Sequence, residues 1–127
     1  MCENRFYICR HCGNLVGLIQ DGGAPLFCCG QKMEHLQPGT VEASTEKHVP
    51  VVTVSGNIVE VSVGSAPHPM TEEHSIQWVY LQTSAGGQRK CLAPGGAPTV
   101  RFALTEGEHP VAAFAYCNLH GLWKTEL

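Results

Sequence analysis

The sequence predicts an all-β protein in which a small cysteine-rich module precedes an antiparallel β-sandwich. The 14 glycines and 8 prolines are scattered between short apolar segments, which favours many turns over long helices. After residue 40, apolar and polar residues alternate along several of these segments, as they do in half-buried strands. Five of the seven cysteines lie within the first 38 residues, which indicates a separate module there.

The first 38 residues hold few large apolar side chains and are too few to fold on a hydrophobic core alone. A module of this size normally needs a metal ion, disulfides or a partner to offset the entropy of the chain. We therefore expect a metal-stapled module over residues 1–38 and a β-sandwich over residues 39–127, with the boundary near Gln37–Gly39.

Two cysteine pairs in the module predict its metal site. Cys9 and Cys12 form the first pair, and the adjacent residues Cys28 and Cys29 form the second. Adjacent Cα atoms lie only ~3.8 Å apart, which is below the ~4.4 Å lower edge for ordinary disulfides, so a disulfide within the second pair would be strained. Four thiolates suit tetrahedral zinc or iron, and the spacing leaves open whether the site is structural or redox-active.

The strands of the sandwich are predicted by their period-two patterns. In Asn57–Val63, Val59, Val61 and Val63 share the face opposite Glu60 and Ser62. Four further segments rich in β-branched or aromatic residues are expected to be strands: Val51–Ser55, Ser75–Thr83, Thr99–Thr105 and Val111–Cys117. The best helix candidate, Val41–His48, spans at most a turn or two.

A second set of metal-ligand residues lies at the predicted strand ends and turns. It comprises His48, His68, His74, Cys117 and His120. A single histidine on a strand is more often an ordinary core or surface residue, but loops on one side of a sandwich can bring five such donors together. We expect a second metal site there, whereas His11, His35 and His109 are interpreted as surface histidines.

Composition excludes several classes of function. The formal net charge is −3, so a general affinity for nucleic acid is not expected. The longest apolar run, Val111–Cys117, is far shorter than the ~18 residues of a membrane span. The first residues show no basic segment leading into an apolar stretch, so we expect a soluble, cytoplasmic protein that does not bind membranes.

These motifs, taken together and in this order, closely resemble the desulfoferrodoxin family of two-centre superoxide reductases. The resemblance rests on Tyr7–Asn14, Cys28–Gly30, Glu46–Pro50, His68–Met70, Glu73–His74 with Trp78, and Tyr116–Lys124. It implies a desulforedoxin-like module with iron on the four cysteines and an immunoglobulin-like sandwich that holds the catalytic iron. It also implies a homodimer that takes electrons from a small carrier such as rubredoxin.

For the catalytic iron, the resemblance implies four equatorial imidazoles from His48, His68, His74 and His120, and an axial thiolate from Cys117. The sixth position would be open in the ferrous state. The implied reaction is the one-electron reduction of superoxide to hydrogen peroxide, without release of oxygen. The family assigns the lysine that matches Lys47 to attraction of the anion, and Glu46 would occupy the open position after oxidation.

Two other classes of function stay open at this stage. The chain would be a pure electron carrier if the four-thiolate iron did the work and the second site were closed to small anions. It would be a structural or metal-storage protein if zinc filled both sites. The spacing of the cysteines does not exclude zinc as a substitute at the four-thiolate site.

Overall fold

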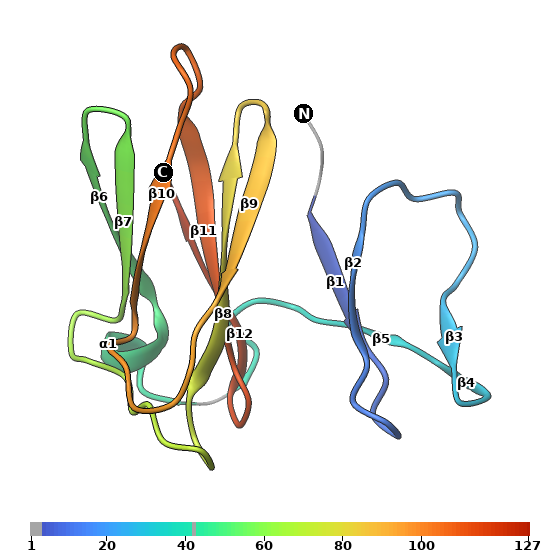
Figure 1. Ribbon diagram of the computed structural model, residues 1–127. Helices are drawn as coiled ribbons and strands as arrows, with labels where there is room; N and C mark the ends of the chain where they lie inside the picture. Colours follow the sequence, from blue (N-terminus) through green and yellow to red (C-terminus); the bar gives the residue numbers. More distant parts are fainter. Residues whose placement is uncertain (1–3, 42) are drawn as a thin grey trace. The chain divides into compact units, whose positions relative to one another are not determined.

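The computed structural model describes residues 4–41 and 43–127, and the chain divides into two compact units, residues 1–37 and 38–127. Both units are built from short antiparallel strands, which confirms the all-β prediction (Figure 1). Cys2, which the sequence places in an N-terminal tail, lies outside the described residues. No helix in the described ranges is long and apolar enough to cross a membrane.

The N-terminal unit contains a three-stranded sheet and a separate two-stranded hairpin. The sheet has the order β2-β1-β5, and the hairpin pairs β3 with β4. The bounds are β1 Arg5–Ile8, β2 Leu15–Leu18, β3 Phe27–Cys28, β4 Gln31–Lys32 and β5 Glu34–His35. Phe6, Ile8, Met33 and Leu36 are buried in this unit. This small core fits the expectation that the unit depends on more than apolar packing for its stability.

The C-terminal unit is a sandwich of two antiparallel sheets (Figure 1). One sheet has the order β10-β7-β6, and the other has the order β12-β11-β8-β9. The bounds are β6 Pro50–Ser55, β7 Ile58–Val63, β8 Ile76–Thr83, β9 Gly86–Cys91, β10 Thr99–Ala103, β11 Pro110–Cys117 and β12 Gly121–Glu126. The five strands predicted in this unit are confirmed, and β9 and β12 are additional.

The apolar core of the sandwich lies between its two sheets. Val59, Val61 and Val63 are all fully buried, which confirms the face predicted from the period-two pattern of β7. From the other sheet, Ala113 and Cys117 belong to the same core cluster. Because side chains alternate along a strand, Cys117 continues the inward-facing row of β11 at the end of that strand. The core therefore brings a thiol to one end of the sandwich.

The helix is shorter than the expected Val41–His48. It is the single turn α1, Thr45–His48. Pro50 explains its C-terminal limit, because proline disfavours the helical conformation of the preceding residue, and Val49 is extended with φ −71° and ψ 121°. Ser44 before the helix is extended as well, with φ −64° and ψ 116°. The turn ends with His48 buried and with Glu46 and Lys47 exposed.

Candidate metal centres

The first candidate centre is the cluster of four cysteine sulfurs in the N-terminal unit. The Sγ atoms of Cys9, Cys12, Cys28 and Cys29 all lie within 4.8 Å of one another. The Sγ of Cys28 lies 3.6 Å from that of Cys12 and 3.9 Å from that of Cys29. Cys9 is buried, whereas Cys12 and Cys29 are exposed. The structure thus brings together all four cysteines that the motif singles out.

A tight turn allows the two adjacent cysteines to face one cluster. Cys28 pairs with Gln31 across the β3–β4 hairpin, so Cys29 and Gly30 occupy the two central turn positions. Both have positive φ, 53° for Cys29 and 70° for Gly30, as type I′ hairpin turns require. A positive φ is uncommon for a residue with a β-carbon. At Cys29 it forms part of the turn that allows the sulfurs of Cys28 and Cys29 to face the same cluster.

The shifted pKa values of two of these thiols agree with a cluster that fits a cation. A hydrogen bond from the Cys12 backbone N–H lowers the pKa of the Cys9 thiol to about 6. A hydrogen bond with the Cys12 side chain raises the pKa of the Cys29 thiol to about 12. Four sulfurs this close cannot all carry negative charge without a positive charge among them. A thiophilic cation such as iron or zinc supplies that charge.

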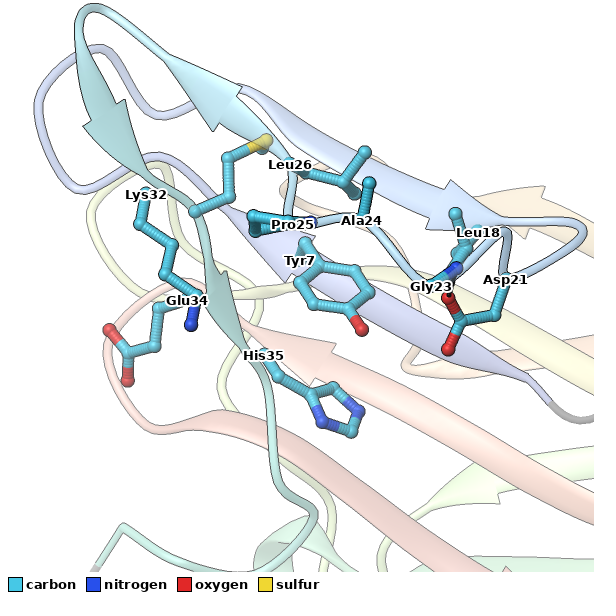
Figure 2. Close-up of a pocket in the computed structure, with 11 residues that line it drawn as sticks. Tyr7, Leu18, Asp21, Gly23, Ala24, Pro25, Leu26, Lys32, Glu34 and His35 are labelled. Carbon is cyan, nitrogen blue, oxygen red and sulfur yellow. Dashed lines mark hydrogen bonds between the residues drawn. The ribbon is translucent and has the colours of Figure 1, made fainter.

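The N-terminal unit also contains an open pocket, which is separate from the cysteine cluster. Its lining includes Tyr7 and His35, whose rings stack with centroids 5.0 Å apart (Figure 2). Leu18, Ala24, Pro25, Leu26 and Met33 supply apolar surface, and Asp21, Lys32 and Glu34 supply charge. The four cysteines do not line the pocket, so we do not assign it to the metal chemistry.

The second candidate centre lies in the C-terminal unit. The ligand atoms of His48, His74, Cys117 and His120 all lie within 4.8 Å of one another. The fifth predicted donor, His68, lies beside this group, with its Nε2 3.1 Å from the Nε2 of His48. His48, His68 and Cys117 are buried, and the other two side chains are half-buried. The donors come from α1, from the segments after β7 and before β8, from the last residue of β11, and from the β11–β12 turn.

The tautomers of two histidines show that their Nε2 atoms carry lone pairs. The Nδ1 of His48 lies 2.6 Å from the Ser44 carbonyl oxygen, and the Nδ1 of His68 lies 2.7 Å from the Pro69 carbonyl oxygen. Carbonyl oxygens only accept, so both Nδ1 atoms carry the proton. Burial lowers the pKa of His48 and lowers that of His68 to about 4, so both rings are neutral at pH 7. Their bare Nε2 atoms therefore face each other.

Two facing lone pairs repel unless a cation lies between them, and this is the strongest indication that the site fits a metal ion. A further indication comes from His74, whose Nε2 is buried and has no hydrogen-bond partner. Burial also lowers the pKa of His74, which favours the neutral ring that a metal requires. Neutral imidazoles combined with one thiol form a donor set of the kind that binds iron or zinc.

A three-residue turn, residues 118–120, joins Cys117 at the end of β11 to Gly121 at the start of β12 and contains His120. Cys117 pairs with Gly121 at the ends of β11 and β12, and Gly121 has a φ of 77°, which a glycine adopts without strain. The His120 Nδ1 lies 3.8 Å from the Cys117 Sγ and 3.1 Å from the His48 Nε2. His120 therefore faces the cluster through Nδ1, whereas His48 faces it through Nε2.

Trp123 supports two of the histidines. Its indole N–H donates to the His120 carbonyl oxygen at 3.0 Å, and its ring centroid lies 5.0 Å from that of His48. Trp123 and Trp78 are both buried. The hydrogen bond from Trp123 was not predictable from its residue type, because the acceptor is a backbone carbonyl.

Glu46 and Lys47 are exposed and directly precede His48. The Glu46 carbonyl oxygen accepts hydrogen bonds from the Ala66 backbone N–H at 2.8 Å and from the Ser65 hydroxyl at 3.2 Å. A hydrogen bond from its own backbone N–H lowers the pKa of the Glu46 carboxyl, so this group is ionised at neutral pH. These hydrogen bonds to its carbonyl hold the backbone of Glu46, while the charged side chains of Glu46 and Lys47 extend toward solvent.

The fold and the two clusters together define a two-centre metalloprotein, and comparison with known proteins identifies its family. The family described as Desulfoferrodoxin matches residues 40–126, and the one described as Desulfoferrodoxin, N-terminal domain, matches residues 2–36. The desulfoferrodoxin of Nitratidesulfovibrio vulgaris is 44% identical over 124 residues, which cover 98% of this chain and 97% of the relative. The chain belongs to the desulfoferrodoxin family.

Solved structures agree with this assignment. The superoxide reductase from Treponema pallidum superposes with a TM-score of 0.83 at 43% identity, covering 98% of this chain and 99% of that one. The one-iron superoxide reductase from Giardia intestinalis superposes with a TM-score of 0.53 at 37% identity, covering 65% of this chain and 99% of that one. The fold class predicted from sequence, including the resemblance to this family, is confirmed.

Proposed function

We propose that this protein is a superoxide reductase. The reaction is the transfer of one electron and two protons to superoxide, which yields one hydrogen peroxide and no oxygen. The observation that carries the proposal is the His48–His68 pair of facing Nε2 lone pairs, next to the buried Cys117 thiol and the unpartnered His74 Nε2. The superoxide reductases among the relatives and solved structures support it.

In this proposal, residues 39–127 hold the catalytic iron and residues 1–38 hold a second iron on Cys9, Cys12, Cys28 and Cys29. The imidazoles of His48, His68, His74 and His120 and the thiolate of Cys117 would hold the catalytic iron, which would remain accessible to the substrate. When bound there, iron supplies the one-electron couple that the reaction needs. The Ser44 and Pro69 carbonyls hold His48 and His68 in the tautomers that leave Nε2 free.

Lys47 is assigned to attraction of the anionic substrate. It is exposed and precedes the buried His48, so its ammonium group can approach an anion at the cluster from the solvent side. The formal net charge of the chain is −3, so this attraction must be local. Lysine also holds three N–H donors, which can organise a water molecule that delivers protons.

Glu46 is assigned a role in the oxidised, resting form of the enzyme. Its carboxylate is ionised and exposed, and its backbone is tied to Ser65 and Ala66, so only its side chain needs to move for it to reach the cluster. In that position its carboxylate would protect the oxidised centre and would withdraw when the next electron arrives.

The remaining assignments rest on the sequence. We propose a homodimer in the cytoplasm that receives electrons from a small carrier such as rubredoxin. A reducing compartment agrees with the six described cysteines, which are all free thiols in the structure. At the four-cysteine centre we propose iron, with zinc as a substitute that the same four thiolates would also bind.

The products distinguish this reaction from dismutation and from simple electron transfer. The reduced, iron-loaded protein is mixed with a known amount of superoxide, and peroxide and oxygen are then measured. We expect one peroxide for each superoxide consumed and no oxygen. One oxygen for each peroxide would indicate dismutation instead. A pure electron carrier would have a second site closed to small anions. Its visible spectrum would therefore not change when azide is added.

A further inference from the structure

The strand pairing that holds the Cys117 thiol ends just before it reaches His74. In the β11–β8 ladder the last pair is Cys117 with Ile76, and the register shifts at that point. His74 lies two residues beyond this pair, in the turn that precedes β8. Continued backbone pairing therefore does not explain how this imidazole is kept at a fixed distance from the thiol.

The side chain of Asn118, the residue after Cys117, continues the connection. Its Oδ1 accepts the Ser75 backbone N–H at 3.0 Å, and its Nδ2 donates to the Glu73 carbonyl oxygen at 2.8 Å. Its own backbone N–H donates to the Ser75 carbonyl oxygen at 3.3 Å. One carboxamide thus bonds to the main chain on both sides of His74, as the backbone of a paired strand residue would.

The turn that carries His74 is fixed internally by a different residue. The Thr71 N–H and Oγ1 both donate to the His74 carbonyl oxygen, at 2.9 and 3.1 Å, and the His74 N–H donates to the Thr71 Oγ1 at 3.0 Å. These bonds set the shape of the turn, but they connect it to nothing outside. The Asn118 carboxamide therefore has the separate task of fixing the turn against the strand that carries Cys117.

We propose that Asn118 is a positioning residue that sets the place of the His74 Nε2 relative to the Cys117 Sγ. The inference rests on the proposed metal centre and adds a residue to it. A ring nitrogen of His74 and the Cys117 Sγ lie within 4.8 Å of each other, and the His74 Nε2 is buried and unpartnered, so a metal ion there depends on how this turn is placed. Only an amide of this length both accepts from Ser75 and donates to Glu73.

The discriminating variant is Asn118→Asp in the full chain. Aspartate has the same shape and still accepts the Ser75 N–H, but it cannot donate to Glu73 and sets a carboxylate oxygen against that carbonyl. Asn57→Asp is the matched control, because it makes the same chemical change at an exposed residue between β6 and β7. Both variants are compared with the wild type in their affinity for Fe²⁺, measured by competition with a chelator.

We expect Asn118→Asp to bind Fe²⁺ at the histidine–cysteine centre about 10- to 100-fold more weakly, as is typical when a residue that orients a ligand is lost. We also expect the thiolate-to-iron charge-transfer band of the oxidised protein to shift in wavelength. The spectrum of the four-cysteine centre should stay unchanged and serves as an internal reference. Equal affinity and an equal band position in Asn118→Asp, Asn57→Asp and the wild type would overturn the inference.

A second variant tests the contact itself. Asn118→Leu removes both side-chain hydrogen bonds, so the Ser75 amide should exchange with solvent at least ~10-fold faster in the Zn²⁺-loaded full chain, as measured by NMR. Unchanged exchange would overturn the inference even if affinity fell. A wild-type chain that binds neither Fe²⁺ nor Zn²⁺ at this centre would overturn the proposed function and this inference with it. If the wild type and Asn118→Asp both bind Fe²⁺ normally, the inference about Asn118 is overturned and the proposed function is not.

Discussion

Gly64 lies against the carbonyl oxygen of Glu46 so closely that a β-carbon on it would come within 2.5 Å of that oxygen. The same carbonyl accepts hydrogen bonds from Ser65 and Ala66, so residues 64–66 all contact the backbone of Glu46. The contact requires a glycine, and it holds the backbone that carries the exposed side chains of Glu46 and Lys47.

Gly64→Ala is therefore expected to displace the Glu46–Lys47 backbone. The new methyl group meets backbone atoms, which cannot move aside as a flexible side chain would, so a cost of about 1–3 kcal/mol in unfolding free energy is expected. We also expect a several-fold slower reaction with superoxide. Thermal unfolding and stopped-flow kinetics measure the two effects.

Ser65→Ala is the control for this variant, because it removes one hydrogen bond to the same carbonyl and adds no atoms. Its effect on both measurements should be smaller. Equal behaviour of the two variants would show that the close approach of Gly64 does not place this segment.

Lys47→Ala should slow the bimolecular reaction with superoxide and weaken its dependence on ionic strength. Salt screens the attraction between an exposed ammonium and an anion, so removing the ammonium removes the part of the rate that salt suppresses. Pulse radiolysis at several salt concentrations measures this. Lys32→Ala, which removes the same charge from an exposed position in the N-terminal unit, is the control. A Lys47→Ala rate constant equal to that of the wild type would remove Lys47 from the mechanism.

Cys12→Ser should damage the four-cysteine centre and leave superoxide reduction largely intact. The reason is that the two clusters lie in separate units, and each is built from residues of its own unit. The visible spectrum reports the loss of the first centre, and the rate with superoxide reports the second. Cys91→Ser, at an exposed cysteine of β9, should change neither measurement. A large loss of activity in Cys12→Ser would show that the first centre participates directly in catalysis.

The folding stability of the protein at acidic pH should depend on Glu108. Hydrogen bonds from the hydroxyl of the buried Thr83 and from the Thr105 backbone lower the pKa of this carboxyl below its ordinary value of 4.5. The pKa of Glu108 is therefore lower in the folded protein than in the unfolded one. For this reason, its ionised carboxylate stabilises the fold fully at pH values above the ordinary pKa. This stabilisation is lost as the pH falls through the folded-state pKa.

Glu108→Gln should therefore lower stability near neutral pH, and its difference from the wild type should shrink as the medium becomes acidic. Urea unfolding at a series of pH values tests this, and metal release at low pH affects both proteins alike. Glu106→Gln removes an equal charge two residues away and is the control. A difference between Glu108→Gln and the wild type that is constant with pH would contradict this role for the Thr83–Glu108 hydrogen bond.

The sequence predicted the sandwich strands that alternate or are rich in β-branched and aromatic residues, and it missed β9 and β12. The alternation of Val59, Val61 and Val63 is a direct consequence of one buried face. In contrast, β9 begins with Gly86–Gly87 and continues with polar residues, because it is an edge strand. The side chains of Gln88 and Lys90 donate to the carbonyl oxygens of Ala103 and Arg101 on β10. That contact between the sheets leaves no periodic signal in the sequence.

The candidate donors were predictable because cysteine and histidine carry metal chemistry in their residue type. The structure places them in two clusters, while their roles as ligands remain predictions. The groups that orient them were not predictable, because Ser44 and Pro69 act through backbone carbonyls. Asn118 bonds to the backbone of residues more than 40 positions away in the sequence. Only the folded chain reveals such partners.

The most direct test of the central claim is the oxidation of the reduced, iron-loaded protein by a pulse of superoxide, followed at the thiolate-to-iron charge-transfer band. Metal analysis of the same sample should give two irons per chain. We predict that the band appears in a fast second-order reaction that consumes one superoxide per catalytic iron, and that Cys117→Ser lacks it. Iron at the histidine–cysteine centre that stays reduced after the pulse would contradict the account.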